Sequence, residues 1–115
     1  MDIETYRNYC LSLKGVTESF PFDENTLVFK VKEKMFSATD VDRFRSINLK
    51  CDPERAIELR EKWPAVTPGY HMNKRHWNTI EMDDTIPDSL LYQLIKDSYD
   101  LVIAGLPRKE QQDLL

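Results

Sequence analysis

Glycine, cysteine and long apolar runs are all scarce in this sequence. Only three glycines occur among 115 residues, too few and too far apart for a phosphate-binding P-loop or a dinucleotide-binding fingerprint. The two cysteines, Cys10 and Cys51, form no Cys-x-x-Cys pair. We therefore expect reduced, partly buried thiols and neither a disulfide framework nor a redox motif. These shortages exclude nucleotide-binding enzymes of the P-loop and Rossmann classes.

No apolar run approaches the roughly 18 residues that a membrane-spanning helix requires. The first residues, Asp2, Ile3 and Glu4, do not open a basic segment followed by an apolar one, as a secretory signal would. We therefore expect a cytoplasmic protein with no membrane partner. The net charge of -4 excludes a surface that is basic throughout, although it leaves room for a local basic patch.

The composition is that of a folded domain, because 41% of the residues are apolar and 31% are charged. The length fits one hydrophobic core, and the sequence contains no repeat, low-complexity segment or linker. We expect a single domain over residues 1–106 and a short C-terminal tail over residues 107–115. The tail is expected either to form one more helical turn or to fray.

Apolar residues at helical spacing predict three helices. Asp2 and Asp52 stand at the positions of N-caps, and the second is followed by proline at the first helical position. Gly15 stands where a left-handed residue ends the first helix, and Gly105, followed by Pro107, stands as the stop of the last helix. The predicted ranges are Asp2–Leu13, Asp52–Trp63 and Pro87–Ala104.

Alternating apolar and polar residues predict strands between the first two helices and after the second. Lys32-Glu33 joins two of them as a hairpin turn, and Pro68-Gly69 marks a further turn. Pro21 restricts its segment to the edge of a sheet. The predicted strands are Ser19–Phe22 (an edge strand), Thr26–Val31, Lys34–Thr39, Arg45–Lys50 and His76–Met82.

Strands that cluster in sequence, with helices at both ends, favour an α+β two-layer sandwich over a parallel, doubly wound sheet. The expected order is α-β-β-β-α-β-α, with or without the edge strand. In such an antiparallel sheet, helices pack on one face and the other face can meet water. Ile80 should face the helices, so Trp77 should point away from them. A large aromatic ring there is either covered by a loop or the tail, or offered to a partner.

Little in the sequence supports metal binding or catalysis. His71 and His76 are five residues apart, with no cysteine or carboxylate at a zinc-ligand spacing. Cys51 precedes a helix N-terminus, where the pKa of a thiol can fall, but the next residue adds negative charge. Asp83-Asp84 is either a solvated lead-in to a helix or part of a cation-binding cluster. We expect no catalytic residue, no metal and no cofactor, and therefore a protein that is not an enzyme.

Cations gather in two parts of the sequence. One part holds six Lys or Arg against three acidic residues, and the other holds two cations with aromatic neighbours and no acid. Lys and Arg neutralise phosphate and aromatic rings stack on bases, so both parts suit nucleic acid. A solvated hairpin surface would carry the same residues. The cations are Lys30, Lys32, Lys34, Arg43, Arg45 and Lys50, then Lys74 and Arg75 beside Tyr70, His71, His76 and Trp77.

Several segments carry a resemblance to a known family, and they cover nearly the whole chain to about Leu106. The segments are Tyr6–Gly15, Phe20–Phe22, Val28–Val31, Lys34–Phe36, Leu49–Glu54, Tyr70–Thr79 and Ser98–Val102. In them the sequence resembles the MmcQ/YjbR-like family. The resemblance implies an antiparallel sheet with helices packed on it, as in the CyaY/frataxin fold, and double-wing DNA binding in which β-hairpins are the wings.

By this resemblance, the cations of the wings are Lys30, Lys32, Lys34, Arg43 and Arg45. The residues of the family's signature segment are Lys74, Arg75, His76 and Trp77. The first hypothesis is therefore a non-enzymatic DNA-binding protein that contacts phosphate through these cations. The alternative is a protein-interaction domain that uses the open sheet face around Trp77. A third hypothesis is a small-molecule or metal site where His71, Lys74 and His76 meet.

Overall fold

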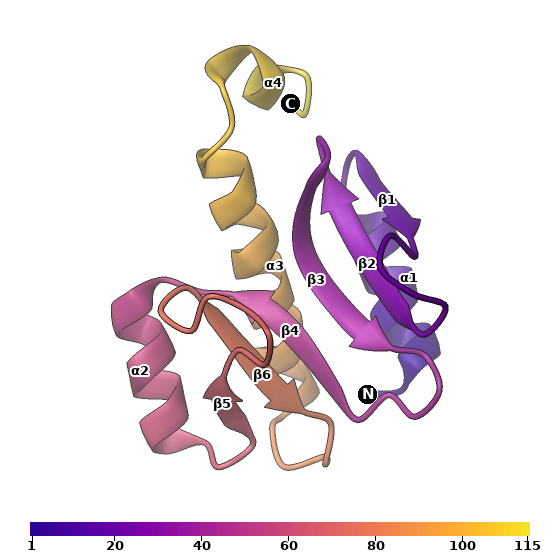
Figure 1. Cartoon of the computed structure of the whole chain (residues 1–115). Helices are drawn as coiled ribbons and strands as arrows, with labels where there is room; N and C mark the ends of the chain where they lie inside the picture. The colour runs from indigo at the N-terminus through magenta and orange to yellow at the C-terminus, as the bar shows by residue number, and fades with distance from the viewer.

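The computed structural model describes residues 1–115 as one six-stranded antiparallel sheet with four helices (Figure 1). The strands lie in the order β1-β2-β3-β4-β6-β5. Their bounds are β1 Val16–Ser19, β2 Thr26–Val31, β3 Lys34–Asp40, β4 Ser46–Lys50, β5 Val66–Pro68 and β6 Trp77–Glu81. The helices are α1 Ile3–Ser12, α2 Pro53–Lys62, α3 Asp88–Ala104 and α4 Arg108–Gln112.

Helices α1 and α3 lie behind the sheet in Figure 1, so one face is covered and the other is open. Helix α3 packs on β2, β3 and β4, helix α1 packs beside β1, and α2 contacts the edge strand β5. The predicted α+β class, with an antiparallel sheet and helices on one face, is confirmed. None of the four helices is long and apolar enough to cross a bilayer.

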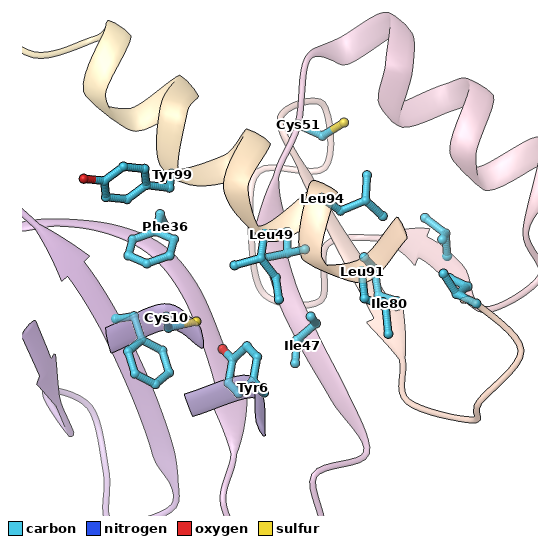
Figure 2. Packing of buried hydrophobic residues seen from close by; sticks show 14 of the residues in the cluster. Tyr6, Cys10, Phe36, Ile47, Leu49, Cys51, Ile80, Leu91, Leu94 and Tyr99 are labelled. Carbon is cyan, nitrogen blue, oxygen red and sulfur yellow. The ribbon is translucent and has the colours of Figure 1, made fainter. Parts of the chain in front are cut away.

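The covered face holds the hydrophobic core, because alternate residues of each strand point toward the helices. Tyr6 of α1 packs edge-on against Phe29, and Tyr99 of α3 packs edge-on against Phe36. Ile47 and Ile80 lie opposite each other on β4 and β6 and complete the centre of this layer (Figure 2). Large aromatic and branched side chains therefore fill the space between sheet and helices.

Polar side chains on the covered face are all paired. The Tyr6 hydroxyl and the Ser37 hydroxyl lie 2.6 Å apart, which ties α1 to β3. The Ser98 hydroxyl of α3 donates to the Phe36 carbonyl at 2.5 Å and accepts from the Lys50 amide at 2.8 Å. No buried side-chain nitrogen or oxygen lacks a partner. These bonds fix the helices on the sheet without leaving an unpaired polar group in the core.

Several local predictions are confirmed. Asp2 caps α1 by accepting from the Thr5 amide at 2.8 Å, and Asp52 caps α2. Lys32 and Glu33 both have positive φ, 49° and 67°, so they form the two-residue turn that joins β2 to β3. Primed turns of this kind match the twist of the flanking strands.

Two local predictions are wrong. The edge strand is Val16–Ser19, not Ser19–Phe22, because Pro21 has no N–H for a ladder and the following residues turn. Strand β5 stands at Val66–Pro68, where only a turn was expected, since three residues are too few for alternation to show. The position of Gly105 at the end of α3 is confirmed, with φ -85°, and Gly15 has the left-handed φ of +77° that was predicted.

The C-terminal tail forms helix α4 and turns back onto the domain. Leu114 packs on the core, and the Asp113 carboxylate lies 3.0 Å from the Lys32 amine. The Gln111 side chain donates to the Leu106 carbonyl at 2.8 Å. The tail thus lies against the β2–β3 turn, at one end of the sheet (Figure 1).

Candidate binding groove on the open face of the sheet

Small residues form the middle of the open face. Val28, Ala38, Asn48, Thr79 and Thr67 lie opposite one another on β2, β3, β4, β6 and β5. Val28 and Ala38 are buried although no helix covers them. The loops at the two sides of the sheet must therefore shield this row, and its small side chains leave a hollow between them.

The hollow is a groove of about 600 Å³, the open-face groove. Its size lies within the range of small-molecule sites in proteins. Strands β3 and β4 form its floor, the β1–β2 loop forms one wall and the β5–β6 loop forms the other. The lining residues are Phe22, Asp23, Thr26, Met35, Ala38, Thr39, Asp40, Arg45, Ser46, Asn48, Tyr70, His71 and Met72.

The first wall is held by Asp23. Its carboxylate accepts from the amides of Asn25 and Thr26 at 2.8 Å and 2.7 Å and from the Thr26 hydroxyl at 3.1 Å. These hydrogen bonds lower the pKa of Asp23, so the carboxylate stays charged. Beside it, the Phe22 side chain is 71% exposed although it lines the groove.

The second wall is the β5–β6 loop, residues 69–76, which is fixed from both ends. The Gly69 amide donates to the Trp77 carbonyl at 2.8 Å, and the Lys74 amine donates back to the Gly69 carbonyl at 2.9 Å. A Cβ on Gly69 would lie 2.8 Å from the Trp77 Cβ, so only glycine fits there. His71 has φ 57°, which is uncommon for a residue with a side chain.

Arg60 of α2 clamps the same loop. Its Nε donates to the Asn78 side-chain oxygen at 2.7 Å, and its terminal nitrogen donates to the carbonyls of Lys74 and Trp77. Asn78 is 2% exposed on the covered face, so the guanidinium joins the helix, the last strand and the loop. Charge-assisted bonds of this kind are among the stronger ones in proteins.

The floor and the second wall are joined by a chain of hydrogen bonds. The Tyr70 amide donates to the Thr79 hydroxyl oxygen at 2.8 Å, and this hydroxyl donates to the Asn48 Oδ1 at 2.5 Å. The Thr79 oxygen thus accepts from Tyr70 while its proton is donated to Asn48, so the Asn48 Oδ1 is the amide atom engaged by Thr79. The Asn48 Nδ2 makes no hydrogen bond within the protein, and Asn48 lines the groove.

One end of the groove carries both signs of charge. The Asp40 carboxylate accepts from the backbone amides of Arg43 and Arg45 at 3.3 Å and 3.2 Å and so closes the turn between β3 and β4. The Arg45 guanidinium lines the groove without an ion-pair partner. The three charged residues of the lining are therefore Asp23, Asp40 and Arg45, a net charge of -1.

The structure separates the cations that were predicted to form two wings. Lys32 lies at the β2–β3 turn, where Asp113 pairs with it, and Lys34 starts β3 beside it. Arg43 and Arg45 lie beyond the other end of β3. Six residue steps along a strand span about 20 Å, so the two groups occupy opposite ends of the sheet.

A second set of predicted residues does come together. Lys30 pairs with Met35 and Lys50 pairs with Trp77, so Lys30, Lys50 and Trp77 share the open face near one end of the strands. Arg75 is exposed in the loop two residues before Trp77. These four residues are called the basic end of the open face.

Trp77 and the predicted residues near it in sequence lie in different surroundings. Trp77 points away from the helices, as its alternation predicted, and it is half-buried against Gly69. His76 is half-buried just before β6, and the Lys74 amine is engaged by the Gly69 carbonyl. His71, Lys74 and His76 do not share the groove, because only His71 lines it.

The cysteines and acidic pair lie outside the groove. Burial raises the pKa of the Cys10 thiol to about 12 and also raises the pKa of Cys51, so neither is an activated nucleophile at neutral pH. Asp83 accepts from the Thr85 amide and hydroxyl and thereby closes a turn. No three histidine, cysteine or carboxylate side chains gather as a metal site would require.

Sequence reasoning missed Phe22, Asn48 and Arg60 as functional candidates. Asn48 lies on the open side of β4, and its freedom to bind depends on Thr79, which is 31 residues away. Arg60 is one of several charged residues in α2, so nothing local distinguishes it from its neighbours. Only Phe22 had a local signal, since an apolar ring beside Pro21 in a loop has no core to enter.

The family follows from comparison of the whole chain with known proteins. The model of the YjbR family matches residues 11–101. The chain belongs to the YjbR family. Two curated relatives from Escherichia coli agree with this: YbdF is 36% identical over 95% of the chain and 90% of its own length, and YjbR is 32% identical over 100% and 98%.

Solved structures of similar proteins have the same fold. A Deinococcus radiodurans protein with the domain called DUF419 is 42% identical, covers 97% of this chain over 86% of its own, and superposes with a TM-score of 0.92. A Pseudomonas syringae protein is 25% identical over 88% of this chain and 98% of its own, with a TM-score of 0.74. The YjbR fold is thus shared by proteins whose names assign no activity.

Proposed function

We propose that the protein binds DNA without enzymatic activity and contacts the phosphate backbone with the basic end of its open face. The observation that carries this proposal is the strand register. It places Lys30 and Lys50 on the same uncovered face and puts Trp77 opposite Lys50. Cations beside an aromatic ring are the groups that bind phosphates and stack on bases.

The geometry favours this set over the full list of predicted cations. Lys32 is paired with Asp113 and Lys74 donates to a backbone carbonyl, so both would have to give up a partner to bind phosphate. Lys30, Lys50 and Arg75 form no ion pair within 4.0 Å in the protein. Two strand spacings separate Lys30 from Lys50, about 10 Å, which suits contact with neighbouring phosphates.

Binding of a fluorescent oligonucleotide, single-stranded and as a duplex, across a salt series tests the proposal. If Lys30 and Lys50 each contact one phosphate, the double variant Lys30→Ala/Lys50→Ala should lower the slope of log affinity against log salt. The expected decrease is about 1.4 for a single strand and about 1.8 for a duplex. Thermal unfolding of the variant shows whether the fold is retained.

The matched control is Arg108→Ala/Lys109→Ala, which removes the same charge from the exposed surface of α4. This control should leave the salt dependence unchanged. Absence of DNA binding at low salt would overturn the proposal. An equal effect of the two double variants would do the same, because it would mean that net charge alone, and not the basic end, governs the affinity.

A further inference from the structure

We propose that the open-face groove binds a planar, uncharged heterocycle with the hydrogen-bonding edge of adenine, as the free base or its nucleoside. The site is distinct from the basic end, since Lys30, Lys50, Arg75 and Trp77 do not line it. The inference therefore does not rest on DNA binding. Three features carry it: aromatic walls, a carboxamide in the floor with an unpaired amide, and a charge balance unsuited to phosphate.

The walls present flat rings that the protein does not cover. Phe22 is 71% exposed and Tyr70 is 68% exposed, and they belong to loops on opposite sides of the groove. The Tyr70 and His71 rings lie with their centroids 4.0 Å apart. Exposed aromatic rings around a concave surface typically meet a ligand, and planar ligands gain most from stacking on them.

The floor offers a donor beside an acceptor. The Thr79 hydroxyl donates to the Asn48 oxygen, which leaves Nδ2 without a partner and one oxygen lone pair free on a residue that lines the groove. An asparagine carboxamide pairs in a bidentate manner with the N6 amine and N7 of adenine. The Ser46 hydroxyl, which has no hydrogen-bond partner in the protein, lies on the same strand and also lines the groove.

The charges of the lining select against a phosphorylated ligand. Asp23 and Asp40 outnumber Arg45, and the pKa of Asp23 is lowered by its hydrogen bonds, so this carboxylate stays negative. A phosphate in the groove would meet two carboxylates and one cation. A neutral base or nucleoside meets no such repulsion, and its polar edge can be satisfied by Asn48.

The groove is also formed before any ligand arrives. Arg60 holds the β5–β6 loop by hydrogen bonds to Asn78 and two backbone carbonyls, and Lys74 closes the loop on Gly69. His71 keeps a left-handed backbone conformation inside this loop. Conformations of this kind persist where the surroundings enforce them, commonly at ligand sites. A fixed loop loses little entropy on binding.

Titration of the purified protein with adenosine, followed by calorimetry and by nuclear magnetic resonance, tests the proposal. We expect saturable binding, with shifts of the Asn48 side-chain amide and of the Tyr70 and His71 signals. Inosine carries a carbonyl oxygen in place of the amine and should bind about ten-fold more weakly or worse. Adenosine monophosphate should also bind more weakly than adenosine, because of the two carboxylates.

Two variants and a matched control locate the site. Asn48→Asp keeps an oxygen for Thr79 but removes the amide donors, and should weaken adenosine binding by roughly ten-fold or more. Phe22→Ala should weaken it by a similar factor through lost stacking. Phe20→Ala changes a ring of the same loop that is 49% exposed and does not line the groove, and should leave the affinity unchanged.

No saturable binding of adenosine or adenine would overturn the proposal. So would equal affinity for inosine, tighter binding of the monophosphate, or indifference to both Asn48→Asp and Phe22→Ala. Oligonucleotide binding measured on the same two variants separates the two sites, because the basic end is intact in both. Its loss in Lys30→Ala/Lys50→Ala, with adenosine binding retained, would support two independent sites.

Discussion

Aromatic and polar side chains differ in burial and in hydrogen bonding between the two faces of the sheet. On the covered face, Phe29 and Tyr6 are fully buried, and the Tyr6 hydroxyl is paired with Ser37. On the open face, Phe22 and Tyr70 stand exposed at the rim of a groove, and the Asn48 amide has no partner. Side chains on the covered face stabilise the fold by packing in the core, whereas these aromatic and amide groups on the open face remain accessible to a ligand.

In a small domain, side chains that are not needed for the core are the ones available to bind a ligand. A fully buried aromatic ring is held by neighbours on all sides and cannot be offered to a ligand without unfolding. A ring at the rim contributes little to the core, so its position needs another explanation. Matched substitutions on the two faces should therefore differ in their effect on the free energy of unfolding.

The largest difference is expected between two phenylalanines. Phe29→Ala should lower the free energy of unfolding by about 3–5 kcal/mol, because it removes a ring packed between Tyr6 and Phe36. Phe22→Ala should change it by less than about 0.5 kcal/mol, since the ring is mostly exposed. Urea unfolding followed by circular dichroism measures both. A comparable loss in the two variants would mean that the β1–β2 loop belongs to the core.

An intermediate effect is expected at the clamp between α2 and the groove wall. Arg60→Ala leaves the buried Asn78 oxygen without its donor, which should cost about 1–3 kcal/mol. Amide hydrogen exchange in residues 69–76 should become faster, because the loop loses two carbonyl contacts. Arg55→Ala, on the same helix but exposed, is the control and should change neither. Unaltered exchange in Arg60→Ala would show that the loop is held without the clamp.

A smaller effect is expected from removing one hydroxyl. Tyr6→Phe deletes the partner of Ser37 in the core and should cost about 1 kcal/mol. Tyr70→Phe removes a hydroxyl that has no partner in the protein and should leave the stability unchanged. Denaturant midpoints at matched protein concentration compare the two. Equal midpoints for Tyr6→Phe and the wild type would contradict the role given to the buried pair.

The smallest effect is expected at the surface, and it depends on pH. Arg7 binds both carboxylate oxygens of Glu18, at 2.7 Å and 2.5 Å, and lowers the pKa of Glu18 below 4.5. A lowered pKa gives stability that is complete above pH 4.5 and is lost as the pH falls through the folded-state value. Glu18→Gln should therefore be slightly less stable than the wild type at pH 7 and equal to it in acid.

Thermal unfolding of both proteins over a pH series measures this difference. Glu81→Gln on the open face is the control, because Glu81 forms no ion pair. A difference between Glu18→Gln and the wild type that persists in acid would mean that the pair acts through packing and not through charge.

Local patterns predicted most of the scaffold, because the responsible forces act between near neighbours. Alternation predicted β2 with the bounds Thr26–Val31, and the side chains of Asp2 and Asp52 predicted two helix starts. The patterns failed where few residues carried them, as in β5, or where a turn replaced a ladder, as after Ser19. For the site, the cations near the open face were predicted, but their separation into two ends was not.

The amino-acid order is enough to predict the family, the α+β class and the side of the sheet to which Ile80 and Trp77 point, since alternation and caps depend on adjacent residues. The folded chain is needed to bring the two loops to opposite sides of Ala38 and Asn48, and to bond Thr79 to the Asn48 oxygen so that the amide nitrogen has no partner. It also pairs Lys32 with Asp113 and Arg60 with Asn78. Such contacts join residues far apart in the chain, so no local pattern encodes them.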